Sequence, residues 1–199
     1  MPDIILASSS KYRRALLSKL NIQAQCIAPN IDESPLANET PKESALRLAK
    51  AKAQAIANRS DLALENSIII GSDQVAWTEG TRLGKPGSTE KAFEQLKRQS
   101  GRAVLFHTAL CVQQGNKQYS DVITTEVIFR KLSNEEIMNY IQQDNPIDCA
   151  GSFKSEGAGC MLFERVTSDD PSALIGLPLI RTTEFLRRFG INPLLKTSQ

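Results

Sequence analysis

The run "ASSSKYRR" (7–14), which follows the apolar run "DIIL" (3–6), brings together residue types that can bind phosphate. A helix that starts after such a turn presents free backbone N–H groups and the positive end of its dipole, which favour anions. The serine hydroxyls add donors, and an arginine fork can grip phosphate oxygens. Arg13 and Arg14 differ by about 100° around a helix, so we expect only one of them to face a ligand. The alternative is a capped surface helix whose cations face solvent.

Two acidic segments offer carboxylates. Asp73 lies in "GSDQ" (71–74), directly after the β-branched run "SIII" (67–70), which predicts a strand that ends before it. An acid just past the carboxyl end of a buried strand can bind a metal or take a proton from water. Glu33, in "IDES" (31–34), is a candidate second oxygen ligand. The alternatives are a turn aspartate that bonds its own backbone and a solvated acidic loop.

Lys52 lies on the apolar stripe of a predicted helix. That helix is predicted to start at the capping pair Thr40 and Glu43 and to end near Asn58. A lysine on an apolar stripe either extends along its edge toward solvent or reaches into a site.

Two loops carry further cations and a carboxylate. Lys85 lies in "GKPGS" (84–88), and Lys154 and Glu156 lie in the glycine-rich "AGSFKSEGAG" (150–159). An exposed lysine and a mobile surface loop are the alternatives. Taken together with the acidic segments, these cations suit metal-assisted attack of water on a polyphosphate.

Several kinds of chemistry are disfavoured by composition. The only histidine, His107, lies inside the strand-like run 103–112, and the four cysteines form no CxxC pair. A histidine-rich zinc site and a Ser-His-Asp triad are therefore not expected, and any metal should be an oxygen-liganded ion such as Mg²⁺ or Mn²⁺. The scattered cysteines favour reduced thiols and a cytoplasmic location.

The totals predict one domain spanning residues 1–199. Apolar residues make up 41% of the 199 residues, which is enough for a sizeable core. The formal net charge of +2 argues against a nucleic-acid-coating surface. We find no apolar run of membrane-spanning length and no secretory leader, so we expect no membrane partner.

Strand-like and helix-like runs interleave along the chain, which predicts an α/β fold. The expected strands are 3–7, 67–70, 103–112 and 122–129, and the expected helices are 11–20, 40–58, 89–99, one starting at a second capping box, Ser133 with Glu136, and 181–189. The turn "QQGNKQ" (113–118) makes its two flanking strands an antiparallel hairpin, so the sheet should be mixed.

The ordered segments "ILASSSKYRRALL", "IDES", "RLAKAKA", "IIGSDQV", "GKP" and "AGSFKSEGAG…LFER…DDPSALIGLPL" resemble the Maf family of nucleotide pyrophosphatases. The resemblance covers about residues 3–194 and is closest to the subgroup that hydrolyses 7-methyl-GTP. It implies a twisted mixed sheet flanked by helices, with two lobes and a cleft, as in inosine triphosphate pyrophosphatase. It further implies cleavage between the α- and β-phosphates of a nucleoside triphosphate, a divalent cation (Mg²⁺ or Mn²⁺), a cytoplasmic location and a possible homodimer.

The resemblance also implies roles for individual residues. Asp73 would be the proton acceptor, and Glu33 would help to hold the metal, although an aspartate beside a metal is also a natural ligand. The residues implied to hold phosphates are Ser8, Arg13, Lys52 and Lys85. The residues implied to set substrate specificity are Tyr12, Gln74 and Glu156.

Tyr12 and Glu156 together favour a methylated purine. N7-methylation gives guanine a positive charge, which attracts an aromatic face by about 1–2 kcal/mol when desolvated. The subgroup usually has Trp where this chain has Tyr12, so its methyl selectivity is expected to be weaker. Other subgroups tend to have Arg there and Gln in place of Glu156, and they prefer dTTP and UTP. A dTTP or UTP pyrophosphatase, a nucleotide-binding cell-division regulator with little turnover, and a phosphomonoesterase remain the alternatives.

Overall fold

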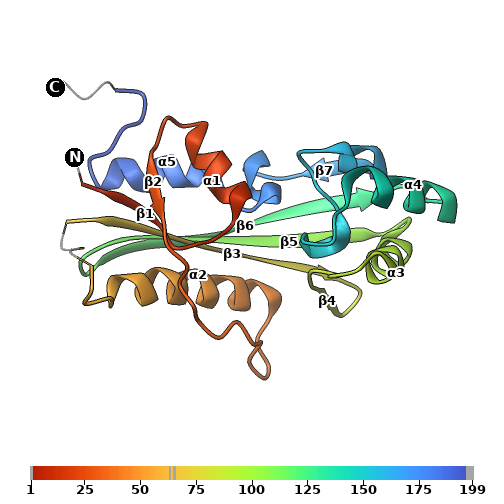
Figure 1. Cartoon of the computed structure of the whole chain (residues 1–199), viewed down its shortest axis with the longest axis horizontal. Coiled ribbons are helices and arrows are strands. Elements are labelled where there is room, and N and C mark those ends of the chain that lie inside the picture. Colours follow the sequence, from red (N-terminus) through yellow and green to blue (C-terminus); the bar gives the residue numbers. More distant parts are fainter. Residues whose placement is uncertain (1, 63, 65, 196–199) are drawn as a thin grey trace.

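The computed structural model describes residues 2–62, 64 and 66–195, and its centre is a seven-stranded mixed sheet (Figure 1). The strand order is β2-β1-β3-β5-β6-β7, and β4 pairs with the far end of β3. Strands β1 and β2 are parallel to each other and to the start of β3, while the other pairs are antiparallel. The strands are β1 (Ile4–Leu6), β2 (Ala24–Cys26), β3 (Ile68–Thr78), β4 (Thr81–Leu83), β5 (Ala103–Gln114), β6 (Lys117–Phe129) and β7 (Phe163–Thr167).

Helices cover both faces of the sheet. Helix α2 packs against one face, and α1 and α5 pack against the other (Figure 1). The helices are α1 (Lys11–Ser18), α2 (Pro41–Ala57), α3 (Thr89–Gln99), α4 (Asn134–Asp144) and α5 (Leu179–Arg188), with short 3₁₀ turns η1 (Ala150–Ser152), η2 (Ala158–Leu162) and η3 (Pro171–Ile175).

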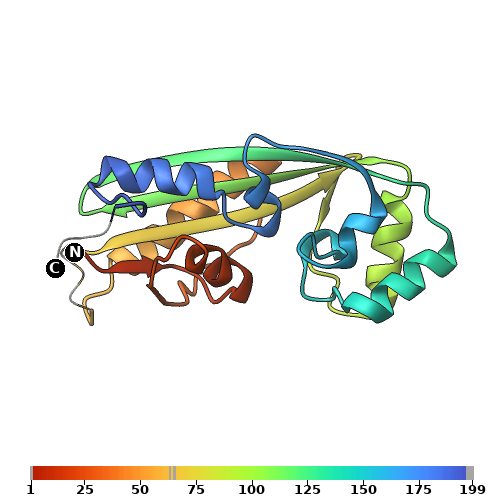
Figure 2. The same cartoon turned by 90° about the horizontal axis from the view of Figure 1, so that it is seen from above.

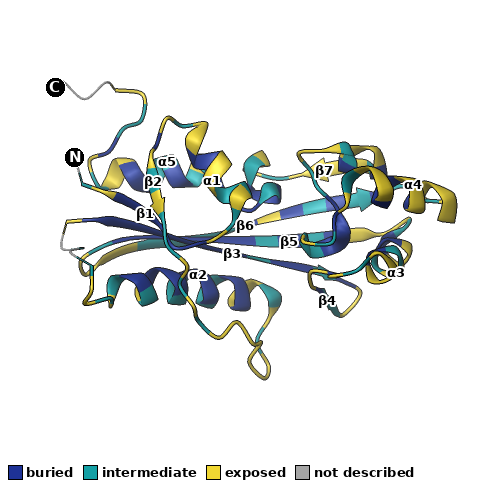
Figure 3. Ribbon diagram, viewed as in Figure 1, coloured by how far each residue is buried: buried dark blue, intermediate teal, exposed yellow. Residues whose placement is uncertain are grey.

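The long strands connect two lobes, which Figure 2 separates along its horizontal axis. The larger lobe has one apolar cluster on each face of the sheet, under α2 and under α1 and α5. In the smaller lobe, a third cluster joins the far ends of the strands to α3, α4 and the 3₁₀ turns, around Phe106, Phe129 and Phe153. Figure 3 shows the resulting pattern, with buried residues along β3 and β5 and exposed residues on the outer helix faces.

Most of the predicted elements are confirmed. Both predicted capping boxes are present, at Thr40 with Glu43 and at Ser133 with Glu136. The predicted hairpin joins β5 and β6, so the mixed α/β sheet is confirmed. Strands β2, β4 and β7 were not predicted; two of them have only three residues, which is too short for a periodic pattern.

The prediction that a strand ends before Asp73 is wrong. Strand β3 continues to Thr78, and Asp73 lies in its middle. Strand β1 pairs with β3 at Ile68–Ile70, and β4 pairs with β3 at Ala76–Thr78. Within the described chain, that edge of β3 between these ranges pairs with no strand. The predicted chemistry therefore lies where β1 ends, alongside the centre of β3.

Within residues 2–62, 64 and 66–195, no helix has the length and apolar character needed to cross a membrane.

Candidate active site

A buried lysine connects the two predicted carboxylates. Nζ of Lys52 lies 2.6 Å from Oδ1 of Asp73 and 2.8 Å from Oε1 of Glu33. Lys52 and Asp73 are each only 5% exposed, whereas the Glu33 side chain is 56% exposed. Lys52 therefore reaches into a site and does not extend along the helix toward solvent. Because unpaired buried charges are costly, each member of the buried pair depends on the other.

The close packing of α2 on β3 places Lys52 beside Asp73. Gly71 lies two residues before Asp73, on the same face of β3. A Cβ atom at Gly71 would lie 2.2 Å from the carbonyl oxygen of Ala49 and 2.8 Å from the backbone nitrogen of Ala53. Only glycine fits there, so Gly71 sets the distance between the helix backbone and the strand.

The turn after β1 places an arginine beside these carboxylates. Ser10 caps α1 by accepting from the Arg13 backbone N–H, and the Ser10 backbone N–H donates to the Ser8 hydroxyl. Nε of Arg13 donates to the Gly176 carbonyl at 2.8 Å, and its Nη1 lies 3.4 Å from the Ser8 hydroxyl. Burial lowers the pKa of Arg13, and the charges of Asp73 and Glu33 oppose this effect. Arg13 still remains a cation, because an arginine does not lose its proton in a protein.

Arg14 points elsewhere. Its side chain is exposed, and Nε donates to the sulfur of Cys26 at 3.1 Å. The expectation that only one of Arg13 and Arg14 turns inward is therefore confirmed, and the inward residue is Arg13.

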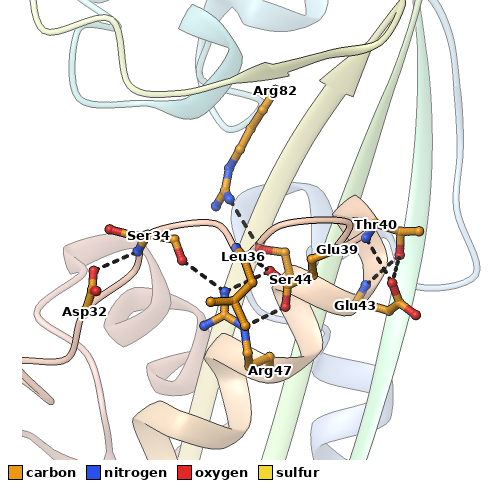
Figure 4. Close-up of polar contacts among 9 residues, drawn as sticks. All are labelled: Asp32, Ser34, Leu36, Glu39, Thr40, Glu43, Ser44, Arg47 and Arg82. Carbon is orange, nitrogen blue, oxygen red and sulfur yellow. Dashed lines mark hydrogen bonds and ion pairs between the residues drawn. The ribbon is translucent and has the colours of Figure 1, made fainter.

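The loop that carries Glu33 is tied to α2 (Figure 4). Arg47 on α2 grips Glu39 with two hydrogen bonds of 2.6 and 2.8 Å, and it also donates to the Ser34 carbonyl at 3.2 Å. Asp32 accepts from the Ser34 backbone N–H at 2.9 Å. The residues that flank Glu33 are thus fixed to the helix that bears Lys52.

Lys85 faces this group from the smaller lobe. It is exposed in the loop after β4, where the Gly87 backbone N–H donates to the Ile147 carbonyl at 3.0 Å. Burial raises the pKa of Glu33, but the hydrogen bond and charge of Lys52, together with the charges of Arg13 and Lys85, outweigh it and hold the pKa below its usual value. Three cations therefore act on one carboxylate.

Gln74 is not part of this group. Successive residues of a strand face opposite sides of the sheet, so Gln74 points away from Asp73. Its amide nitrogen lies 2.9 Å from the Thr108 hydroxyl and 3.0 Å from the Ala173 carbonyl. Ser72, on the same face, donates to the Gly176 carbonyl at 3.0 Å. Gln74 thus helps to hold the η3 segment, whose end in turn accepts from Arg13.

A second group lies between the lobes at the start of α1. The Tyr12 hydroxyl lies 3.2 and 3.3 Å from the carboxylate oxygens of Asp148, and the Cys149 thiol lies 3.6 Å from that hydroxyl. Burial and the charges of Asp148 and Glu156 raise the pKa of Cys149 to about 11, opposed by the hydrogen bond from Tyr12. Glu156 is exposed and close enough to act on Cys149. The structure therefore brings Tyr12 and Glu156 to one region.

Asp148 was missed by the sequence reasoning. It lies in "PIDCAG", which has no local pattern that marks it as functional. Its partner Tyr12 is 136 positions away along the chain, so the contact depends on the fold. Lys154, which was singled out with Glu156, donates to the Asp144 carbonyl instead.

The residues present can share a divalent cation with a substrate but cannot enclose one. Among the described residues, no three His, Cys, Asp or Glu side chains gather into a metal-binding group. Glu33 and Asp73 place one oxygen each on the Lys52 ammonium, so this position already accommodates positive charge. Mg²⁺ is typically held by one or two carboxylates and by substrate phosphates, and two carboxylates fit that arrangement.

His107 takes no part in either group. It is half-buried on β5, and Nδ1 lies 3.0 Å from the Thr124 hydroxyl of β6. The predicted strand 103–112 that contains His107 is present as part of β5.

Comparison with known proteins gives relatives along the whole chain. It is 50% identical over 189 residues to a protein of Burkholderia orbicola named 7-methyl-GTP pyrophosphatase, covering 94% of this chain and 89% of the relative. It is 48% identical to a protein of the same name from Bordetella pertussis, covering 97% and 95%. A solved structure of the Staphylococcus aureus Ham1 protein matches with a TM-score of 0.50 at 15% identity, covering 94% of this chain and 99% of that one, which shows a shared fold. The family described as Maf-like protein matches residues 3–189, and the chain belongs to this family.

Proposed function

We propose that this protein is a metal-dependent nucleoside triphosphate pyrophosphatase that cleaves the bond between the α- and β-phosphates of 7-methyl-GTP. The products are 7-methyl-GMP and pyrophosphate. One observation carries the proposal: Lys52 joins Asp73 and Glu33 beside Arg13 in a chain half identical to a protein named 7-methyl-GTP pyrophosphatase. In this proposal the whole chain forms one catalytic domain, and the protein acts in the cytoplasm. The resemblance to the Maf family favours a homodimer.

The cations would bind and orient the triphosphate. Arg13, held by the Gly176 carbonyl, and the Ser8 hydroxyl lie at the start of α1, where the helix dipole favours anions. Lys52 approaches from α2, and Lys85 approaches from the smaller lobe. Cations on both lobes would fix the phosphate chain, and they would stabilise the charge that develops on the leaving pyrophosphate.

Asp73 would take the proton from the attacking water. Its Oδ1 is occupied by Lys52, and among the described residues none donates a hydrogen bond to Oδ2. That oxygen is free to accept a proton from a water or to bind a metal. A divalent cation bound to Asp73, Glu33 and the phosphates would polarise the phosphoryl group and lower the pKa of bound water.

Product analysis tests the proposal. Incubation with 7-methyl-GTP and Mg²⁺ or Mn²⁺ should release 7-methyl-GMP and pyrophosphate in equal amounts, and EDTA should stop the release until metal is added back. Release of inorganic phosphate and 7-methyl-GDP would contradict it, because a phosphomonoesterase-type reaction removes the terminal phosphate. A matched Asp73→Asn protein controls for contaminating phosphatases.

A further inference from the structure

The aromatic ring and carboxylate between the two lobes already hold a cation. Nζ of Lys11 lies 4.9 Å from the centroid of the Tyr12 ring and 3.3 Å from Oδ2 of Asp148. The Tyr12 hydroxyl lies 3.2 Å from the same carboxylate oxygen. An ammonium group over an aromatic face and beside an ionised acid is the arrangement that also recognises cationic ligands.

We propose that Asp148 is a further specificity-determining residue, which pairs with the cationic ring of an N7-alkylated purine nucleotide, and that Lys11 occupies its place in the free protein. This inference rests on the proposed function, because it names how the same site selects its base. The base would stack on Tyr12, and the Lys11 ammonium would move away from the ring and from Asp148.

The charges at this position favour a cation over a neutral base. Burial raises the pKa of Asp148, but hydrogen bonds from Cys149, Lys11 and Tyr12 outweigh it and hold the pKa below its usual value, so the carboxylate is ionised at neutral pH. Glu156 adds a second negative charge near Cys149. Guanine has no formal charge, whereas N7-methylguanine does, so the methylated base gains a charge attraction to both acids that guanine lacks.

Lys11 can leave this position at little cost. Its side chain is 70% exposed, and that of Asp148 is 46% exposed. Ion pairs with this exposure contribute little to stability, because water screens them and both side chains lose conformational freedom. The Lys11 ammonium therefore occupies the site in the free protein, but the cationic base can displace it. Lys11 acts as a weak competitor of that base.

A purely structural role for Asp148 makes a different prediction. Asp148 could act only by accepting a hydrogen bond from the Tyr12 hydroxyl and so orienting the Tyr12 ring. In that case Asp148→Asn should preserve the preference for the methylated base, because an amide oxygen still accepts a hydrogen bond. If its charge pairs with the base, the asparagine variant should lose the preference for the methylated base, and Asp148→Glu should keep most of it.

Equilibrium binding of 7-methyl-GMP and GMP separates these roles without any turnover. The wild-type protein should bind 7-methyl-GMP about 10-fold more tightly than GMP. Asp148→Asn should reduce this ratio to below about 3 without weakening GMP binding, and Lys11→Met should strengthen 7-methyl-GMP binding about 2- to 5-fold. Lys19→Met, at the other end of α1, is the matched control and should change neither affinity.

Two outcomes would overturn the inference: an unchanged ratio in Asp148→Asn, or equal loss of affinity for both nucleotides in that variant. If Asp148→Asn does not fold, the binding of both nucleotides to Lys11→Met and Asp148→Glu tests the inference instead. A Lys11→Met protein with unchanged affinity for 7-methyl-GMP would contradict the proposal that Lys11 competes with the cationic base. Neither monophosphate contains the bond that the proposed reaction cleaves, so the binding measurement does not depend on turnover. A failed binding prediction would therefore leave the proposed pyrophosphatase reaction standing, and absence of pyrophosphate release would leave the binding result valid.

Discussion

The Lys52 ammonium lies 2.6 Å from Oδ1 of Asp73, and both residues are almost completely buried. The same ammonium lies 2.8 Å from exposed Glu33, so one lysine joins the sheet to the loop above it. The contact has a structural and a chemical consequence. It fixes the acid on β3 relative to α2, and it keeps positive charge where a phosphate would bind.

Lys52→Met should destabilise the protein by about 3 kcal/mol, because it leaves the buried Asp73 carboxylate without its hydrogen-bonded counter-ion. The double variant Lys52→Met with Asp73→Asn should recover part of this loss, since the unpaired carboxylate is removed as well. Urea unfolding measures both, with Lys50→Met on the same helix as control. A single variant as stable as the wild type would show that the pair contributes nothing.

Asp73→Asn should lower the rate of pyrophosphate release at least about 100-fold, because an amide cannot accept the proton from water. The affinity for the nucleotide should change only a few-fold, since the cations that would bind the phosphates around residue 73 remain. Rates and equilibrium binding are measured together, with exposed Asp169→Asn as control. Retained turnover would remove Asp73 from the reaction, whereas a cellular effect that survives the loss of turnover would support a regulatory role.

Gly71→Ala should destabilise the protein by about 3 kcal/mol or more, because its Cβ would meet the α2 backbone at 2.2 Å. Any fraction that folds should also have low activity, since α2 must move and take Lys52 away from Asp73. Gly84→Ala is the matched control, as a Cβ at Gly84 meets no atom of the described residues within 4 Å. Equal thermal stability of the two variants would show that α2 does not depend on this close approach.

Glu39→Gln should destabilise the protein at neutral pH by about 1–2 kcal/mol and weaken substrate binding, because Arg47 would lose its charged partner. The hydrogen bonds from Arg47 lower the pKa of Glu39 from 4.5 to about 2, against the opposing effect of burial. The contribution of Glu39 is therefore complete above pH 4.5 and disappears as the pH falls toward 2.

Urea unfolding of the wild type and Glu39→Gln across this range tests the pH dependence. The difference in unfolding free energy should narrow on acidification, while exposed Glu164→Gln should match the wild type throughout. A difference that stays constant down to pH 2 would show that the Arg47 contact does not stabilise the loop.

Much of the fold follows from local patterns. The capping boxes mark the starts of α2 and α4, and the hairpin turn marks the antiparallel pair of β5 and β6. Lys52 was identified because its charge interrupts an apolar stripe at helical spacing. A charged side chain in that position must either reach solvent or enter a site. These signals span a few residues, so a single sequence displays them.

The remaining features depend on contacts between distant segments. Strand β3 continues through Ser72 and Gln74 because its backbone pairs with β5 there, and their side chains find partners on η3 and Gly176, about 100 positions away. Nothing in "GSDQ" shows those partners, so a turn was the natural prediction. Asp148 was missed for the same reason, since only folding brings it to Tyr12.

The most direct test of the proposed function is a comparison of kcat/KM for 7-methyl-GTP, GTP, dTTP and UTP with Mg²⁺ or Mn²⁺. The rate of each reaction is measured as the release of pyrophosphate. The proposed site predicts the highest value for 7-methyl-GTP, about 10-fold above GTP, because only the methylated base carries the positive charge that Tyr12 and the acids around it attract. Faster turnover of dTTP or UTP would contradict the proposed substrate. Absence of pyrophosphate from all four nucleotides with either metal would contradict the proposed reaction itself.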